Sequence, residues 1–554
     1  MTELRSDIES RLARLKADRQ SWLAHWRDIA QVMMPRAGKF LEDEKNRGAR
    51  KHGHILDNTP IMAARTLGAG MMAGATSPAR PWFRLTTSDP KLDESAPVKQ
   101  WLQDVGEVMR MVFNRSNTYR ALHNCYDELG LFGTSVTVIE DDFDTVINHR
   151  PMTAGEFMVA VNHKGRVDTI YRELQLTVAQ MVGEFGLSAC STTVRNLWDR
   201  RGLDEAVKVV HAIEPRQNRE PGKLDGKGMA WRSVYFEPAA EAGQILREAG
   251  FRDFPALAAR WMVHSNDAYG SSPGMDALGD VLQLQHQQKR KGQAIDYKVN
   301  PPLQLPSSLK HADMNRLPGG VTFVDMVGSN NAIRSMFEVN LDLTHLREDI
   351  LDVRQRINGA FYADLFLMLY NRRDDPSMTA TEVTERHEEK LLMIGPVLER
   401  LHDEMLSPLI EGTFSRMAEA YILPPPPPEL QGRELQVEFV SVLAQAQRAV
   451  ATNGVDRFVA SLGVVAGMKP EVLDKFDADV WADKYADMLG VDPELIVAGE
   501  QVALVRQSRA QQQAAMAQAA QAEQMAGAAS KLGGVDTSKP NALTDVTQAF
   551  AGYT

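Results

Sequence analysis

Three closely spaced glycines are the first residues of this sequence whose type could do chemistry. Gly68, Gly70 and Gly74 could cradle a phosphate with their backbone amides. The stretch lacks the Gly-Lys-Ser/Thr ending of a P-loop, and no clear strand precedes it. Small residues also let two backbones approach closely, so we interpret the stretch as tight helix packing that ends at Ser77-Pro78.

Histidine and cysteine side chains could bind a metal at two places. His52 and His54 are near neighbours, and His123 lies close to Cys125. A zinc site requires a second pair of ligands at a suitable spacing, and neither place has one. We therefore predict no metal site and no cofactor.

Two pairs of adjacent acidic residues could bind Mg²⁺ in an enzyme of DNA metabolism. The pairs are Asp141-Asp142 and Asp374-Asp375, but adjacent residues on a loop usually point in different directions into water. The sequence has no GxSxG, no HExxH and no cysteine-histidine nucleophile signature. We predict no catalytic residue. The enzyme hypothesis would instead require Mg²⁺-dependent turnover that is lost in Asp374→Ala and Asp375→Ala.

One compact basic cluster could contact phosphate. Lys289, Arg290 and Lys291 follow one another on a predicted long helix, and an ordinary solvated helix face is the alternative interpretation. By contrast, residues 381–421 contain nine carboxylates against four Lys and Arg. That segment would repel DNA at close range.

Composition indicates a folded, multidomain protein. The chain has 554 residues, of which 44% are hydrophobic and 24% charged, values typical of soluble globular proteins. Its length corresponds to roughly three or four domains. The net charge of -11 excludes a protein that grips nucleic acid over most of its surface, because such a grip needs clustered Lys and Arg. Any DNA contact should be local or loose.

Cysteine usage and hydropathy predict where the protein resides. Cys125 and Cys190 are too few for a disulfide framework, so we predict two buried thiols and a reducing compartment. No run of about 18 apolar residues occurs, and the first residues carry charges where a signal peptide needs an apolar stretch. We expect neither secretion by that route nor membrane insertion.

The first half of the chain is predicted to mix helices and strands. Ser6 and Glu9 have the spacing of a capping box at the start of an amphipathic helix. Residues 100–270 predict an α+β region with antiparallel pairing, in which Asn162-His163-Lys164-Gly165 is typical of a hairpin turn. The predicted strands span residues 133–140, 157–161, 167–171, 207–213 and 231–236.

From about residue 275 the pattern changes to long helices. The first is predicted over 275–297 and is ended by Asn300-Pro301-Pro302. A compact insertion follows over about 298–338. A second helix is predicted over about 341–370, with apolar residues alternately three and four positions apart, which indicates one packed face.

The rest of the chain is also predicted to be largely helical. A third helical stretch runs to about residue 421, and Pro396 and Pro408 should kink or break it. Five prolines at 424–428 then predict a stiff spacer. The Ala/Gln/Met-rich end is either a helix shared between subunits or disordered.

Three stretches together resemble the portal, or head-to-tail connector, proteins of short-tailed phages. They are LGAGMMAGATSPARPWFRL at 67–85, YGSSPGMDAL at 269–278 and KVNPPLQLP at 298–306. Around these stretches, two predicted long helices are joined by an insertion, as in that family. The resemblance therefore extends over most of residues 5–500. It implies a mixed α+β fold with a predominantly helical core, assembled into a cyclic ring of about twelve copies.

The resemblance also implies a division of the chain and a set of partners. The partners are major capsid and scaffolding proteins, the terminase large subunit, tail or adaptor proteins, and double-stranded DNA passing through the ring. The resemblance further implies that the protein is assembled in the host cytoplasm and lies at the portal vertex of the virion. The implied divisions are N-terminal helices and α+β wing (1–270), first stem helix (271–297), clip (298–338), second stem helix (339–370), tunnel loop (371–380), inner wing or wall helix (381–423), helical crown (424–508) and tail (509–554).

Candidate site residues follow from these divisions. The docking candidates in the clip are Asn300, Pro301, Pro302, Pro318 and Gly319. The candidates for weak DNA contacts in the channel are Lys289, Arg290, Lys291, Arg372 and Arg373.

A ring also has a physical rationale. Two long helices joined by an insertion cannot bury their apolar faces alone, and identical copies around an axis supply the missing neighbours. Net acidity suits a conduit that must not hold phosphate tightly. The alternatives are the metal-dependent enzyme and another virion protein of the core or scaffold. The substantial α+β region disfavours a scaffold.

Overall fold

The computed structural model contains two compact units, Met1–Val450 and Ala451–Thr554. The residues that the structure describes are 2–40, 51, 53–93, 95–220, 222–223, 225–241, 243–299, 303–304, 334–335, 344–370, 393–430, 432–433, 435–441, 443–444, 458–489, 497 and 499–533.

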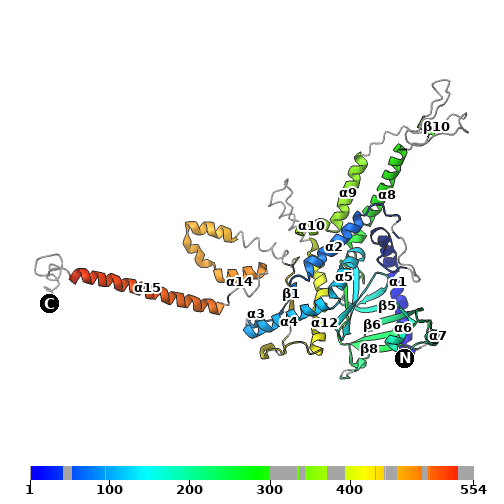
Figure 1. Ribbon diagram of the computed structural model, residues 1–554, viewed down its shortest axis with the longest axis horizontal. Helices are drawn as coiled ribbons and strands as arrows, with labels where there is room; N and C mark the ends of the chain where they lie inside the picture. The colour runs from blue at the N-terminus through cyan, green and yellow to red at the C-terminus, as the bar shows by residue number, and fades with distance from the viewer. Residues whose placement is uncertain are drawn as a thin grey trace, which may run out of the picture. The chain divides into compact units, whose positions relative to one another are not determined.

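Helices account for most of the described secondary structure (Figure 1). The α-helices include α1 (Thr2–Met33), α2 (Thr59–Ala75), α3 (Pro90–Asp93), α4 (Ala96–Arg115), α5 (Thr118–Phe132), α6 (Val178–Phe185), α7 (Thr192–Asp199), α8 (Pro273–Val299), α9 (Thr344–Ala360), α10 (Ala363–Tyr370), α12 (Ser407–Glu419), α14 (Ala478–Leu489) and α15 (Gly499–Gly533).

The strands belong to small antiparallel sheets. They are β1 (Phe83–Thr87), β2 (Thr134–Asp142), β3 (Val146–Met152), β4 (Phe157–Val161), β5 (Val167–Thr177), β6 (Ala206–Pro215), β7 (Trp231–Phe236), β8 (Arg247–Phe251), β9 (Ala256–Arg260), β10 (Leu303–Gln304), β11 (Arg334–Ser335) and β12 (Leu435–Phe439).

The largest sheet has five strands in the order β4-β5-β6-β7-β8. One face packs against α1 through Ile8, Leu12 and Leu15, and the other face packs against α6 and α7. The predicted strands and their antiparallel pairing are confirmed. The predicted hairpin turn is also present, because the Asn162 side-chain oxygen accepts backbone N–H groups and Gly165 has a φ of 76°.

The capping box predicted at Ser6 and Glu9 is wrong. The first helix already begins at Thr2, so Ser6 lies within it and its side chain cannot cap the helix start. A complete capping box occurs instead at the start of α6, where Thr177 and Gln180 exchange side-chain and backbone hydrogen bonds. The spacing rule holds only where the chain enters the helix from an extended residue, as it does at Thr177.

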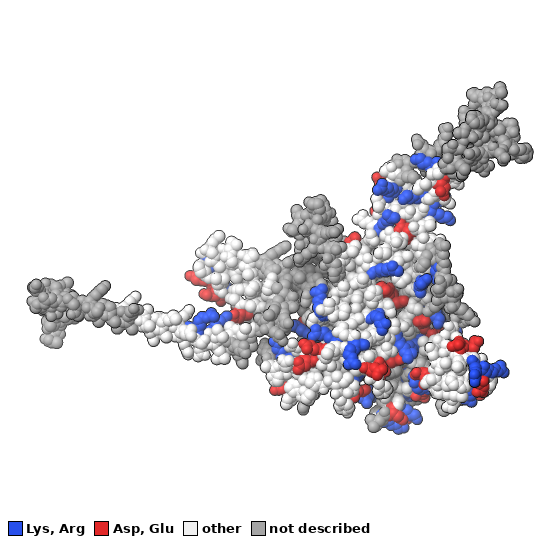
Figure 2. Space-filling model, in the orientation of Figure 1, with Lys and Arg blue, Asp and Glu red and all other residues white. Residues whose placement is uncertain are grey.

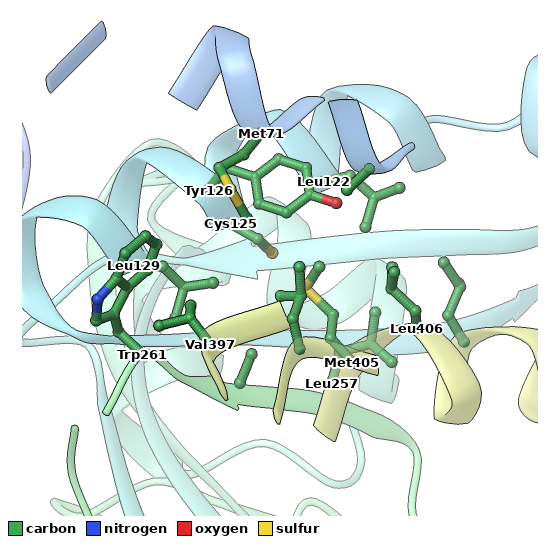
Figure 3. Close-up of a cluster of buried hydrophobic side chains, with 14 of the residues drawn as sticks. Met71, Leu122, Cys125, Tyr126, Leu129, Leu257, Trp261, Val397, Met405 and Leu406 are labelled. Carbon is green, nitrogen blue, oxygen red and sulfur yellow. The ribbon is translucent and has the colours of Figure 1, made fainter. Parts of the chain in front are cut away.

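The second sheet, β3-β2-β9, forms part of the main core together with α2, α5 and the helical residues 393–406. Figure 3 shows side chains of these elements, including Met71, Cys125 and Met405, converging on β2 and β9. Cys125 and Cys190 are both buried, as predicted. Burial raises the pKa of the Cys125 thiol, so it is a packing group and not a reactive one.

The predicted helix over 275–297 is confirmed as α8, and α9 runs back along it. Side-chain contacts between Asp280 and Arg356 and between Gln287 and Asp349 show that the two helices are antiparallel. Figure 1 shows this pair, which we call the helical hairpin, projecting away from the sheets. One stripe of α9, formed by Ile350, Val353 and Ile357, is buried.

The single helix predicted over 341–370 is divided into α9 and α10. Tyr362 has a φ of 53°, which no α-helix permits, and the chain turns there. Phe361 and Phe366 on either side of the turn are each at most 1% exposed. Phe361 continues the buried stripe of α9, and after the turn Phe366 of α10 packs against Gly70 of α2.

Neither Pro396 nor Pro408, which we expected to kink or break the third helical stretch, ends it, because residues 393–419 are helical without interruption. Residues His402–Leu406 form a π-helix that continues directly into α12, and the Ser407 N–H bonds to the His402 carbonyl oxygen. Pro408, which has no N–H to donate, follows this π-helical turn. Within 424–508, which we expected to be helical, Leu435–Phe439 instead forms β12 and pairs with β1. The alternation of apolar and polar residues in LQVEF has the period of a strand.

The second unit contains α14 and α15. Its helices are joined by the ion pair of Arg506 with Asp479, and Trp481 stacks on Tyr485. The Ala/Gln/Met-rich end of the chain is helical through Gly533, and residues 534–554 lie outside the described part.

Candidate functional site

The three glycines of α2 are packing sites, as the sequence indicated. A Cβ atom on Gly68 would lie 2.0 Å from the Asp127 Oδ1 atom, and one on Gly70 would lie 2.2 Å from the Phe366 Cγ atom. Gly74 makes the same kind of contact with Leu443. At each glycine, the missing side chain therefore lets a different neighbouring segment pack directly against the backbone of α2.

The histidines that could have bound a metal have other partners. The His54 Nε2 atom lies 2.6 Å from the Gln31 carbonyl oxygen, and His123 pairs with Asp127 at 3.3 Å. The Cys125 sulfur lies 3.1 Å from the Thr137 hydroxyl. Among the residues that the structure describes, no group of three His, Cys, Asp or Glu side chains could hold a metal ion. The candidate His52 lies outside them.

The first acidic pair is committed to structural contacts. Asp141 accepts a hydrogen bond from Arg416 at 2.7 Å, and Asp142 accepts one from the Thr145 hydroxyl at 2.5 Å. The loop expected at this pair is wrong, because both residues end strand β2, where successive side chains point to opposite faces of the sheet. Asp374 and Asp375 lie outside the described residues.

The basic cluster lies on the distal half of α8. Lys289 and Arg290 are exposed, Lys291 is half-buried, and the Arg290 Nε atom lies 3.4 Å from His286 Nε2. Figure 2 shows Lys and Arg side chains along the helical hairpin. The arrangement can offer positive charge to a polyanion without enclosing it.

Exposed apolar side chains lie on both helices of the hairpin. On α8, Leu282 and Tyr297 flank the basic cluster and are 52% and 59% exposed. On α9, Leu351 is 51% exposed and points away from the buried stripe of that helix. These three side chains are available to a partner that packs along the hairpin.

The far end of the hairpin is closed by a short β-bridge pair. Leu303 pairs with Ser335 and Gln304 with Arg334, so the ends of the predicted insertion lie side by side. The docking candidates Asn300, Pro301, Pro302, Pro318 and Gly319 lie outside the described residues, as do Arg372 and Arg373.

Sequence reasoning missed the residue that holds the base of the hairpin. The Asp57 carboxylate, with a side chain only 3% exposed, bonds to residues of α2, α8 and α9. A lone Asp before a helix carries no signal that its partners lie hundreds of residues away. In the described part of the chain, no helix is long and apolar enough to cross a membrane.

Comparison with known proteins agrees with this geometry. Residues 5–497 match the model of the family described as bacteriophage head to tail connecting protein. The probable portal protein of Bordetella phage BPP-1 is 63% identical over 545 residues, covering 98% of both chains. The portal protein of Salmonella phage epsilon15 is 45% identical over 543 residues, covering 97% of both chains.

Solved structures of phage-like particles are more distant. A chain from the virion of a native gene transfer agent particle is 10% identical with a TM-score of 0.34, covering 78% of this chain and 90% of its own. A chain from the neck of an empty particle of that kind is 11% identical with a TM-score of 0.36, covering 83% and 98%. By the family match and the two close relatives, the chain belongs to the bacteriophage head to tail connecting proteins, the family of phage portal proteins.

Proposed function

We propose that copies of this chain form a closed ring of about twelve subunits at one vertex of the head, through which double-stranded DNA is packaged and ejected. In this proposal the role is structural and not enzymatic. The α+β region is the wing, α8 and α9 are the stem, residues 298–338 are the clip, and residues 371–380 are the tunnel loop. The segments beyond form the inner wall and the crown.

The proposal also assigns partners to these parts. The clip would receive the terminase large subunit during packaging and tail or adaptor proteins afterwards, while capsid and scaffolding proteins surround the wing. Assembly would take place in the host cytoplasm. These assignments rest on membership of the family and on the order of elements along the chain.

The proposal of a ring is supported most directly by the exposed apolar side chains of the helical hairpin. A soluble monomer would expose Leu282, Tyr297 and Leu351 to water at a cost of about 1 kcal/mol or more each. Lateral contact between hairpins of neighbouring copies would cover all three. The net charge of -11 for each chain then keeps the passage from holding DNA tightly.

Polar substitution on this surface tests the ring. We expect Leu282→Ser combined with Leu351→Ser to raise the protein concentration needed for ring assembly about tenfold or more, because each removes roughly 1 kcal/mol of interface burial. Sedimentation velocity over a concentration series measures the shift. The matched control is Met111→Ser on α4, which is 56% exposed but lies off the hairpin. Equal shifts in both variants would contradict the proposed interface.

We also propose that Arg372 and Arg373 border the channel and make weak, transient contacts with phosphate. Reversing both charges, as Arg372→Glu and Arg373→Glu, should weaken the retention of DNA in filled heads because repulsion replaces attraction. The assay is the DNA released from purified heads as the salt concentration rises. Unchanged retention would exclude both residues from the channel wall.

A further inference from the structure

The Asp57 carboxylate joins three helices at the base of the helical hairpin. One oxygen accepts the backbone N–H and the hydroxyl of Thr59, in the first turn of α2, at 2.9 and 2.6 Å. The other accepts the Gln288 amide of α8 at 2.8 Å and the Arg354 guanidinium of α9 at 2.8 and 3.1 Å. One carboxylate oxygen therefore bonds to the start of α2, and the other bonds to both helices of the hairpin.

The backbone at the same point is also bonded to α8. The Gln285 side-chain oxygen accepts the N–H groups of Leu56 and Asp57 at 2.8 and 3.0 Å, and its amide group donates to the Asp57 carbonyl oxygen at 2.8 Å. Reciprocal bonds of this kind fix both position and direction, because neither partner can rotate without losing one of them.

The carboxylate is held in its charged form. Burial by itself would raise the pKa of Asp57, but the hydrogen bonds from Thr59 and the charge of Arg354 outweigh it and lower the pKa below its ordinary value. Hydrogen bonds to a charged group are about twice as strong as neutral ones. Removing the charge while keeping the shape of the side chain is thus a specific way to weaken this junction.

The second half of α2 contacts α10. Phe366 packs directly against Gly70, and α10 runs from this contact to Tyr370, immediately before residues 371–380. One helix of 17 residues therefore contacts the base of the hairpin at its start and the root of the proposed tunnel loop near its end. A shift of the hairpin at Asp57 would be transmitted along α2.

We propose that Asp57 is a positioning residue that sets the direction in which the hairpin leaves the wing, and with it the bore of the DNA passage. The inference rests on the proposed function. It adds a specific role for a buried carboxylate outside the channel: Asp57 keeps the stems of all subunits at one angle, so that the ring offers a uniform passage.

The test uses Asp57→Asn in complete rings and in infected cells. We expect rings with the wild-type number of subunits, about tenfold faster amide hydrogen exchange in the parts of α8 and α9 near Gln288 and Arg354, and a fall of about tenfold in the yield of DNA-filled heads. Exchange in β5–β7 should not change. The matched control is Asp352→Asn, which removes a carboxylate of α9 that is 61% exposed and should leave both readouts at the wild-type level.

A second substitution separates positioning from general loss of stability. Asp57→Asn leaves the Arg354 guanidinium, which is 40% exposed, without its ionic partner. Adding Arg354→Gln removes that charge and leaves two amides that can bond to each other, so it should recover at least half of the lost DNA-filled heads. Wild-type exchange rates in Asp57→Asn, or loss of filled heads without any recovery in the double variant, would overturn the inference. Failure of the wild-type chain to form rings would instead overturn the proposed function.

Discussion

Arg260→Met is expected to lower the free energy of unfolding by about 3–5 kcal/mol, because it leaves a buried carboxylate without its main partner. The Arg260 guanidinium lies 2.6 Å from Glu404, and the two side chains are only 2% and 9% exposed. The same guanidinium donates to the carbonyl oxygens of Gly165 and Asp267 at 2.7 and 3.2 Å. It therefore joins the hairpin turn of the five-stranded sheet to the π-helix.

Urea unfolding of the dissociated chain, followed by tryptophan fluorescence, measures the effect. The control is Arg252→Met, which breaks an ion pair with Glu419 between side chains that are 66% and 52% exposed and should change stability by less than about 0.5 kcal/mol. In Arg260→Met the Glu404 carboxylate keeps only Arg400, at 3.1 Å, as an ionic partner. The double variant Arg260→Met with Glu404→Met should be more stable than Arg260→Met alone, because it removes that poorly compensated buried charge. Equal losses for Arg260→Met and Arg252→Met would contradict the assignment.

Gly70→Leu should destabilise the chain by about 3 kcal/mol. The new Cβ atom would lie 2.2 Å from Cγ of Phe366, a ring that is 1% exposed, so either α10 or α2 must move. Gly106→Leu on α4 is the matched control. Nothing lies within 4 Å of a Cβ atom there, and the helix propensity of Leu should leave that variant at least as stable as the wild type.

A compensating change checks the mechanism of the Gly70 effect. In a Phe366→Ala background the space beside Gly70 is open, so Gly70→Leu should cost less there than in the wild type, by at least about 1 kcal/mol. Thermal unfolding of all four chains gives this coupling energy. Additive losses would show that the close contact between α2 and α10 does not limit the size of residue 70.

Local patterns predicted the α+β region well. The strands at 157–161 and 231–236 occur at the predicted residues. Their β-branched and aromatic side chains favour a strand by their own type and spacing, so a local pattern was enough to predict them. The tight packing around Gly68, Gly70 and Gly74 was also predictable, since small residues in a helix let a neighbouring segment approach its backbone closely. The family could be predicted because three stretches occurred in the right order.

Features that depend on distant partners could not be predicted. The apolar spacing of residues 341–370 continues across Tyr362, so it does not indicate the turn there. The turn accompanies a contact between Phe366 and Gly70, almost 300 residues earlier in the chain. The junction at Asp57 joins residues 231 and 297 positions apart along the chain, and no local pattern indicates such partners. The strand at 435–439 carries a local signal in the alternation of LQVEF, but its pairing with β1, more than 300 residues earlier, has none.

Electron microscopy of the purified chain, with native mass spectrometry of the same sample, tests most directly whether identical subunits enclose a passage for DNA. The expected result is one closed annular species of about a dozen chains, with a central opening in end views that is wide enough for a duplex. A chain that stays monomeric under all assembly conditions, or that forms only open, non-annular oligomers, would contradict the account.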